Sequence, residues 1–248
     1  MSASAAAAVR LPKHITPDPI LEAVAEVRFL PQPVPDAVFG IIYPLVEGQY
    51  PAFEKLPILQ LPDEVREKDP NLLFQPHYRL KAGSMTLQIG PRVISLTTSE
   101  YDTWHTFATN VLALFRTLEE RRVFGAIVRV GLRYINFFEQ NILPRSTVRI
   151  QMAGESIVDQ QIFVRTQVEA APYVTSIQIA TQASVGQPPE ARSGSAIDLD
   201  TFVTSPVLGE DRAGQFADLL NGAHAELKQR FFALLQPDFV ASLNPEYD

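Results

Sequence analysis

Polar and apolar side chains alternate along PILEAVAEVRF, residues 19–29, with the period of a β-strand. One face of this strand carries Glu22, Glu26 and Arg28, and the other carries small or apolar side chains. The proline-rich run that follows ends the strand, because proline has no backbone N–H to donate to a sheet. The sequence thus predicts an early strand with one charged face.

The segment RVGLRYINFFE, residues 129–139, repeats this arrangement in the middle of the chain. Arg129 and Arg133 share one face and are separated by about 13 Å at the usual rise of a strand. Tyr134 and Asn136 fall on the opposite face. We expect these two to be hydrogen-bonding groups at the edge of the core, because buried polar groups need partners.

Apolar residues recur at helical spacing in two long segments. The first, residues 99–122, has Ser99 as its expected N-cap and Asp102 at the capping-box position. The second, residues 211–235, contains Gly222, for which we expect a cost of about 1 kcal/mol relative to alanine. Each helix would lay one apolar stripe on a sheet.

The remaining pattern consists of short elements. A helix is expected over residues 36–48, capped by Asp36 and ended near Pro44 or at Gly48. The proline-rich segment 51–76 has the weakest periodicity and predicts a long ordered loop. Further strands are expected at residues 77–81, 85–89, 92–97, 146–152, 160–170, 173–185 and 195–203.

The chain twice runs through a first strand, several further strands and then a long helix, and this order predicts an α+β fold. We expect two antiparallel sheet-plus-long-helix units in tandem, helix-grip-like or TBP-like, which can join as one continuous curved sheet. The boundaries would be a flexible tail at 1–14, an N-terminal unit at 15–122 and a C-terminal unit at 123–248, packed together as one globular body.

The composition is that of an ordinary globular protein, with 46% hydrophobic and 20% charged residues among 248. A net charge of −7 disfavours nucleic-acid binding through phosphate neutralisation. The absence of cysteine excludes disulfides, thiolate zinc sites and a cysteine nucleophile. Residues 1–10 lack the features of a signal peptide and no apolar run could span a membrane, so we expect a cytoplasmic protein without a membrane partner.

The charged faces of the two patterned strands have two interpretations. Glu22 and Glu26 have the same spacing as Arg129 and Arg133, so the four charges interleave if the strands are neighbours. In the first interpretation they form a structural ladder, in which each opposite-charge pair contributes about 0.2–1 kcal/mol. In the second they form the floor of a cavity, where the arginines hold a carboxylate or phosphate.

Other residues give weaker signals for chemistry. Asp198 and Asp200 share a strand face, for which a solvated surface is a better explanation than a metal site. The four histidines are scattered, and His105 follows Trp104 near the start of the first long helix. Because no hydrolase, nucleotide-binding or metalloenzyme motif occurs, the sequence predicts no catalytic residue, metal or cofactor.

Three stretches, PILEAVAEVRF, LQIGPRVISLTT with the following YDTW, and RVGLRYINFFE, resemble a sporadically distributed bacterial family of uncharacterised proteins of similar length. The resemblance implies no activity and hence no catalytic residues. The patchy occurrence of that family favours a link to mobile elements or defence. The positions that carry the likeness are the candidate ligand-binding residues Glu22, Glu26, Arg28, Arg129, Arg133, Tyr134 and Asn136.

Two functions follow as hypotheses. The first is a non-catalytic intracellular interaction or regulatory module that binds a protein partner, an arrangement compatible with a homo-oligomer. The second is a small-molecule binding protein, or an unusual enzyme, that recognises a carboxylate or phosphate in a polar Glu/Arg cavity.

Overall fold

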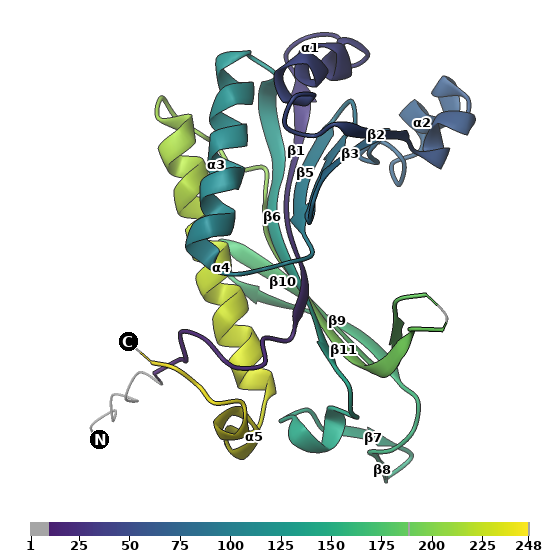
Figure 1. The fold of residues 1–248 in the computed structure, drawn as a ribbon, viewed down its shortest axis with the longest axis vertical. Coiled ribbons are helices and arrows are strands. Elements are labelled where there is room, and N and C mark those ends of the chain that lie inside the picture. The colour runs from purple at the N-terminus through teal and green to yellow at the C-terminus, as the bar shows by residue number, and fades with distance from the viewer. Residues whose placement is uncertain (1–9, 188, 248) are drawn as a thin grey trace.

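The computed structural model describes residues 10–187 and 189–247, and its centre is one nine-stranded antiparallel sheet (Figure 1). The strand order is β2-β3-β4-β5-β1-β6-β11-β10-β9, and β7 and β8 form a separate hairpin. The strands are β1 (Ile20–Pro31), β2 (Ala52–Lys55), β3 (Tyr78–Ala82), β4 (Met85–Ile89), β5 (Val93–Thr98), β6 (Phe124–Phe138), β7 (Ile150–Met152), β8 (Glu155–Ile157), β9 (Phe163–Ala170), β10 (Tyr173–Val185) and β11 (Arg192–Thr204).

Two long helices cover the same face of this sheet (Figure 1). They are α3 (Trp104–Glu120) and α4 (Arg212–Leu234). The shorter helices are α1 (Ala37–Val46), α2 (Asp63–Lys68) and α5 (Pro237–Ser242), with 3-10 turns η1 (Pro57–Gln60) and η2 (Leu143–Arg145). None of the helices in the described ranges is long and apolar enough to cross a membrane.

The order of strands reveals a repeat of elements across the middle of the sheet. In each half a long strand, β1 or β6, lies beside the last strand of a three-stranded meander, and a long helix follows. The two long strands pair with each other at the centre. The predicted α+β class and the continuous sheet are therefore confirmed, and the sheet runs without a break across the boundary expected between 122 and 123.

The core lies between the sheet and the two long helices. Alternation places Ala23, Ala25, Val27 and Phe29 of β1 on the helix-facing side, where all four are buried. Helices α3 and α4 are antiparallel neighbours whose buried stripes meet, with the rings of Phe115 and Phe216 stacked 3.7 Å apart. The predicted apolar faces are thus the ones that the fold buries.

The start of α3 differs from the prediction. Its N-cap is Thr103, whose hydroxyl accepts a hydrogen bond from the backbone N–H of Thr106 at 3.2 Å. Ser99 lies before the helix, where its backbone N–H donates to the carbonyl of Ser84 in the β3–β4 turn. Residues 99–103 therefore remain outside the helix, and the capping box predicted with Asp102 is wrong.

Two other local predictions need correction. Asp36 occupies the N-cap position of α1 but makes no capping hydrogen bond, and the helix continues through Pro44 to Val46. The segment 51–76, expected to be a loop, contributes η1, α2 and the edge strand β2. Of the expected flexible tail, residues 1–9 lie outside the described residues, whereas Lys13 donates its backbone N–H to Glu246 at 2.6 Å.

Gly222 has a different role from the weak point predicted in α4. A Cβ atom at this position would overlap the hydroxyl group of Tyr173 from β10. That hydroxyl donates a hydrogen bond to the carbonyl of Leu219 at 3.2 Å. The absence of a side chain at Gly222 thus allows the helix and the tyrosine to approach each other.

Candidate functional site

Arg129 is the centre of an ion-pair ladder on the face of the sheet opposite α3 and α4. Its Nη1 donates to Glu26 Oε1 at 2.7 Å, and its Nη2 donates to both carboxylate oxygens of Asp200 at 2.6 and 2.7 Å. The guanidinium lies over Gly131, where a Cβ atom would clash with it, and 4.3 Å from the ring centroid of Phe202. Glycine at 131 therefore makes room for the arginine between its two acidic partners.

Arg28 and Arg133 extend the ladder on either side. Arg28 Nε donates to Glu26 Oε1 at 2.7 Å, while Arg133 donates to both oxygens of Asp198 at 2.7 and 2.5 Å. These hydrogen bonds from Arg133 to Asp198 raise the pKa of the guanidinium, against the opposing effect of burial. Glu22 is exposed and acts on Arg133 only through its charge.

The structure thus brings together only some members of the predicted Glu/Arg set. Glu26 joins Arg28 and Arg129 as the ladder interpretation requires, but the partner of Arg133 comes from β11. The two aspartates of β11, expected to be a solvated face, supply the remaining acceptors. Within the described parts of the chain no group of three or more His, Asp or Glu side chains could hold a metal ion.

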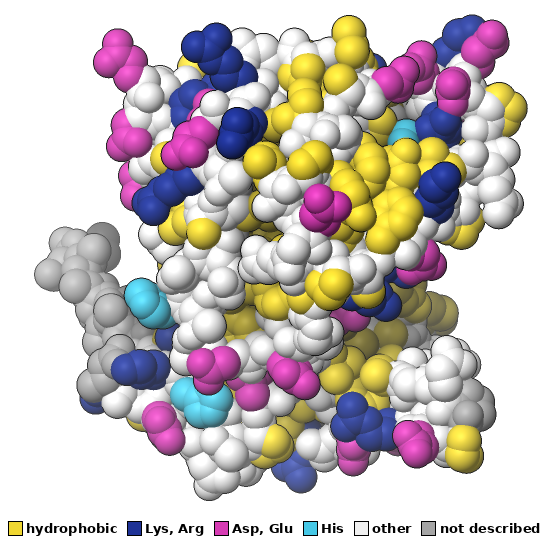
Figure 2. Space-filling view, turned by 45° about the horizontal axis from the view of Figure 1, so that its top comes forward, with side chains coloured by type: hydrophobic (Ala, Val, Ile, Leu, Met, Phe, Trp, Pro, Cys, Tyr) yellow, Lys and Arg dark blue, Asp and Glu magenta, His cyan; other side chains and the backbone are white. Residues whose placement is uncertain are grey.

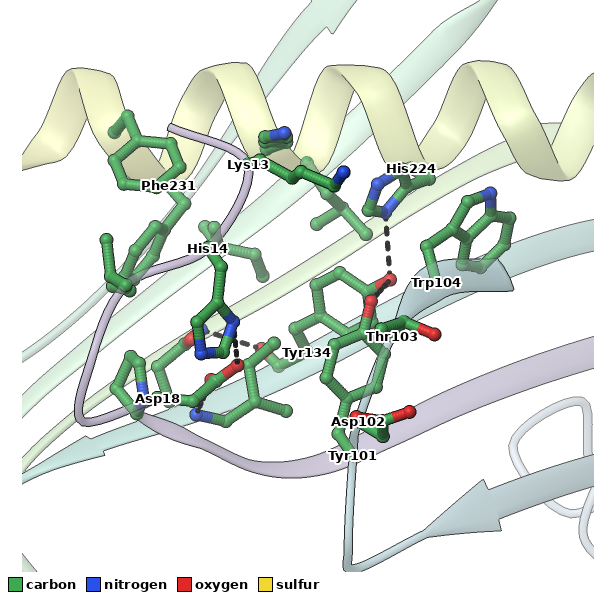
Figure 3. Close-up of a pocket in the computed structure, with 18 of the residues that line it drawn as sticks. Lys13, His14, Asp18, Tyr101, Asp102, Thr103, Trp104, Tyr134, His224 and Phe231 are labelled. Atoms are coloured by element: carbon green, nitrogen blue, oxygen red, sulfur yellow. Dashed lines mark hydrogen bonds and ion pairs between the residues drawn. The ribbon is translucent and has the colours of Figure 1, made fainter. Parts of the chain in front are cut away.

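A cavity of about 670 Å³ lies on the other face of the sheet, between the sheet and the long helices (Figure 3). We call it the helix-face cavity. Its floor is formed by Tyr134 and Asn136 of β6 and Leu199 of β11. Its walls are the segment 101–105 at the start of α3, the face of α4 from 224 to 232, and the segment 13–20 that precedes β1.

Three side chains in the helix-face cavity form a hydrogen-bonded chain (Figure 3). The hydroxyl groups of Tyr101 and Tyr134 are 3.3 Å apart, and the Tyr134 hydroxyl is 2.9 Å from His224 Nδ1. The imidazole stacks on the indole of Trp104 with 4.6 Å between centroids and an angle of 2°. Trp104 is itself held by a 2.9 Å hydrogen bond from Nε1 to Asn221 Oδ1.

Burial moves the pKa of all three members of this chain further from neutral pH. It raises the pKa of Tyr101 to about 12, and it raises the pKa of Tyr134 well above its ordinary value. Burial also lowers the pKa of His224 to about 4, helped by the positive charge of Lys228. Removing a group from water disfavours its charged form, which explains the opposite directions for phenol and imidazole.

Asn136 completes the polar floor. Its Nδ2 donates to the backbone carbonyl of Ile197 at 3.1 Å, across the β6–β11 pair. Together with Tyr134 it lies on the opposite face of β6 from Arg129 and Arg133, as the alternation predicted. The predicted candidate residues are therefore divided by the sheet: two line the helix-face cavity and five lie on the open face.

The outer wall of the cavity is made by two segments that are distant in sequence. The backbone of His14 pairs with that of Glu246, and Thr16 donates its N–H to Leu243 at 2.7 Å. Asp18 follows on this wall, where Oδ1 accepts the backbone N–H of Ile20 at 2.9 Å and Oδ2 lies 3.9 Å from His14 Nδ1. Burial raises the pKa of the Asp18 carboxyl.

Sequence reasoning missed most of the groups that converge here. The scattered histidines at 14 and 224 are separated by most of the chain, yet both line the cavity, and exposed His105 lies at its rim. Two features of the sequence could have indicated this site. Tyr101 and Trp104 belong to the YDTW stretch, and residues 224, 227, 228 and 231 share one face of a helix.

No protein-family model matches the chain, and no curated protein matches it in sequence.

Proposed function

We propose that this protein binds a small organic molecule in the helix-face cavity. The observation that carries the proposal is the cavity itself, whose volume of about 670 Å³ suits a ligand of metabolite or drug size. Apolar and aromatic side chains form most of its lining, and a few polar groups converge on the interior: Asp18, Tyr101, Tyr134, Asn136 and His224. This combination is typical of small-molecule sites.

The chemistry of these groups favours binding over acid–base catalysis. An efficient general acid or base has a pKa near the working pH. Here burial moves the pKa of His224 down to about 4 and that of Tyr101 up to about 12, away from neutrality in both directions. Both groups then act as neutral hydrogen-bond donors or acceptors, which orient a ligand without exchanging protons with it.

The chain contains a direct reporter for this proposal. Its single tryptophan, Trp104, lines the cavity, so its fluorescence will respond to a ligand that enters. We expect a screen of metabolites to yield compounds that change this emission and raise the melting temperature, because binding to the folded state stabilises it. Replacing Ile20 by phenylalanine narrows the cavity and should weaken both responses.

A matched control lies on the opposite face of the sheet. Arg133→Ala removes a member of the ion-pair ladder and leaves the cavity lining unchanged. Equal ligand responses in this variant and the wild type support the helix-face cavity. A response lost in Arg133→Ala but kept in Ile20→Phe would place the ligand on the open Glu/Arg face instead, and no response to any compound would overturn the proposal.

A second candidate function, a module that binds a protein partner, is favoured by the apolar surface near α1, β2 and α2. Half of the exposed large hydrophobic side chains in the described chain come from residues 30–65: Leu30, Val34, Phe53, Leu61 and Val65. Hydrophobic side chains gather on the upper part of the molecule in Figure 2, the region of these elements in Figure 1. Clustered exposed apolar side chains are common at protein interfaces.

The test of this second function is a pull-down from the native host with matched surface variants. We expect the pair Leu61→Ser and Val65→Ser to lose a partner that the wild type recovers. Met152→Ser, which changes a still more exposed apolar side chain on the β7–β8 hairpin, should retain it. Identical recovery by all three proteins would remove this surface from consideration. The cytoplasmic location stays a prediction.

A further inference from the structure

The carboxylate of Asp18 is the acidic group set most deeply among the walls of the helix-face cavity. Its side chain retains 25% exposure, whereas Asp102 and Glu246, which also line the cavity, are exposed residues at the rim. The contacts of Asp18 within the described chain are one backbone N–H at 2.9 Å and the imidazole of His14 at 3.9 Å (Figure 3). An ionised carboxylate can accept about four hydrogen bonds, so Asp18 has capacity for a donor.

Aromatic rings share the cavity with this carboxylate. Tyr101, Trp104, Tyr134 and Phe231 all line it, and the negative charge of Asp18 acts on both tyrosine hydroxyls. The face of an aromatic ring attracts a cation, most strongly where water is partly removed. A carboxylate and several aromatic rings that line one cavity therefore provide two kinds of attraction for the same positively charged group.

The charged side chains around the cavity also favour a cation over an anion. Three carboxylates and two lysines line it, and Lys13 is exposed at the rim. Lys228, on α4, lies close enough to His224 to lower the pKa of the imidazole. An anionic ligand could pair with Lys228 but would be repelled by Asp18, whereas a cation gains from the interior carboxylate.

We propose that the ligand of the helix-face cavity is an amine with an apolar or aromatic body. Its ammonium group donates hydrogen bonds to Asp18 and lies against the tyrosine rings, while its body packs on Leu227 and Phe231 of α4. This inference rests on the proposed function, since it names the class of molecule that the same cavity receives.

The experiment compares three probes that share a phenethyl-type body and differ in the head group. Phenethylamine is cationic, phenethyl alcohol is neutral and hydrocinnamate is anionic. Trp104 emission and melting temperature are measured for each probe with the wild type, Asp18→Asn and Asp102→Asn. Asn at 18 keeps an acceptor for the N–H of Ile20, and Asp102→Asn removes an exposed carboxylate of the rim, so the two variants form a matched pair.

We expect phenethylamine to bind at least about tenfold more tightly than the other two probes, since hydrogen bonds to charged groups contribute about 1.5–3 kcal/mol. Asp18→Asn should remove this preference, and Asp102→Asn should retain it. Equal binding of the three probes, or an unchanged preference in Asp18→Asn, would overturn the inference while leaving a ligand-binding cavity. Binding of none of the three would also overturn it. The proposed function fails if the broader metabolite screen gives no response, or if the response is lost in Arg133→Ala but kept in Ile20→Phe.

Discussion

The close approach of α4 to Tyr173 reverses the usual effect of a glycine-to-alanine substitution in a helix. Alanine at an exposed helical site gains about 1 kcal/mol over glycine. At Gly222 the new methyl group would occupy the space of the Tyr173 hydroxyl, so the ring must move and lose its hydrogen bond to Leu219. Overpacking of this kind costs about 1–3 kcal/mol, and the lost hydrogen bond costs about 1 kcal/mol more.

We therefore expect Gly222→Ala to lower the free energy of unfolding by about 1–3 kcal/mol. Urea unfolding followed by far-ultraviolet circular dichroism measures this change. Gly40→Ala is the control, because Gly40 lies in α1 and no atom within 4 Å meets its added Cβ. That variant should gain about 0.4–1 kcal/mol.

A double substitution isolates the steric cause. In the Tyr173→Leu background the obstructing hydroxyl and ring are gone, so Gly222→Ala should be neutral or stabilising there. Two results would refute the reasoning: a Gly222→Ala protein more stable than the wild type, or an equal loss in both backgrounds. Either would mean that the contact with Tyr173 does not determine the residue at this position.

Further predictions concern the ladder and the buried histidines. Arg129→Ala should cost about 2–3 kcal/mol in urea unfolding, because it leaves the partly buried carboxylate of Asp200 unpaired and Glu26 with Arg28 alone. Removing Arg133, with 42% side-chain exposure, should cost about 1 kcal/mol or less. A smaller loss for Arg129→Ala than for Arg133→Ala would contradict the ladder as described. Burial lowers the pKa of His224, and of His77 just before β3, from 6.5 to about 4. Stability is therefore complete above about pH 6.5 and falls as the pH decreases toward 4, by up to about 3 kcal/mol per histidine. Unfolding at about pH 7.5 and about pH 5 checks this, and His224→Gln should lose less stability than the wild type over that interval.

The elements of the sheet were largely predictable, because alternation depends on local sequence alone. The faces of β1 and β6 follow from which side chains are apolar, and the fold buries those sides. Which side chains become partners across two strands depends on the register of the strands, and the alternation pattern alone does not determine that register. In the observed register Val24, not a glutamate, lies opposite Arg133, and Glu26 lies opposite Gly131. Arg133 therefore turns to Asp198.

The helix-face cavity could not be predicted in the same way. Its lining comes from six separate parts of the chain, and each side chain in isolation is an ordinary apolar, aromatic or polar residue. Tyr134 and Asn136 were assigned to the core side of β6, but what lies above them depends on how α3 and α4 are placed. The start of α3 was mislocated because both Ser99 and Thr103 are suitable N-cap residues, and in the structure Ser99 joins the β3–β4 turn while Thr103 caps the helix.

The outer wall of the cavity has a consequence for local opening of the molecule. Its backbone pairs join residues 13–16 to residues 243–246, and these segments lie outside the nine-stranded sheet and both long helices. Local opening can therefore separate the two segments while the core stays folded. The cavity can thus lose and regain one side without global unfolding.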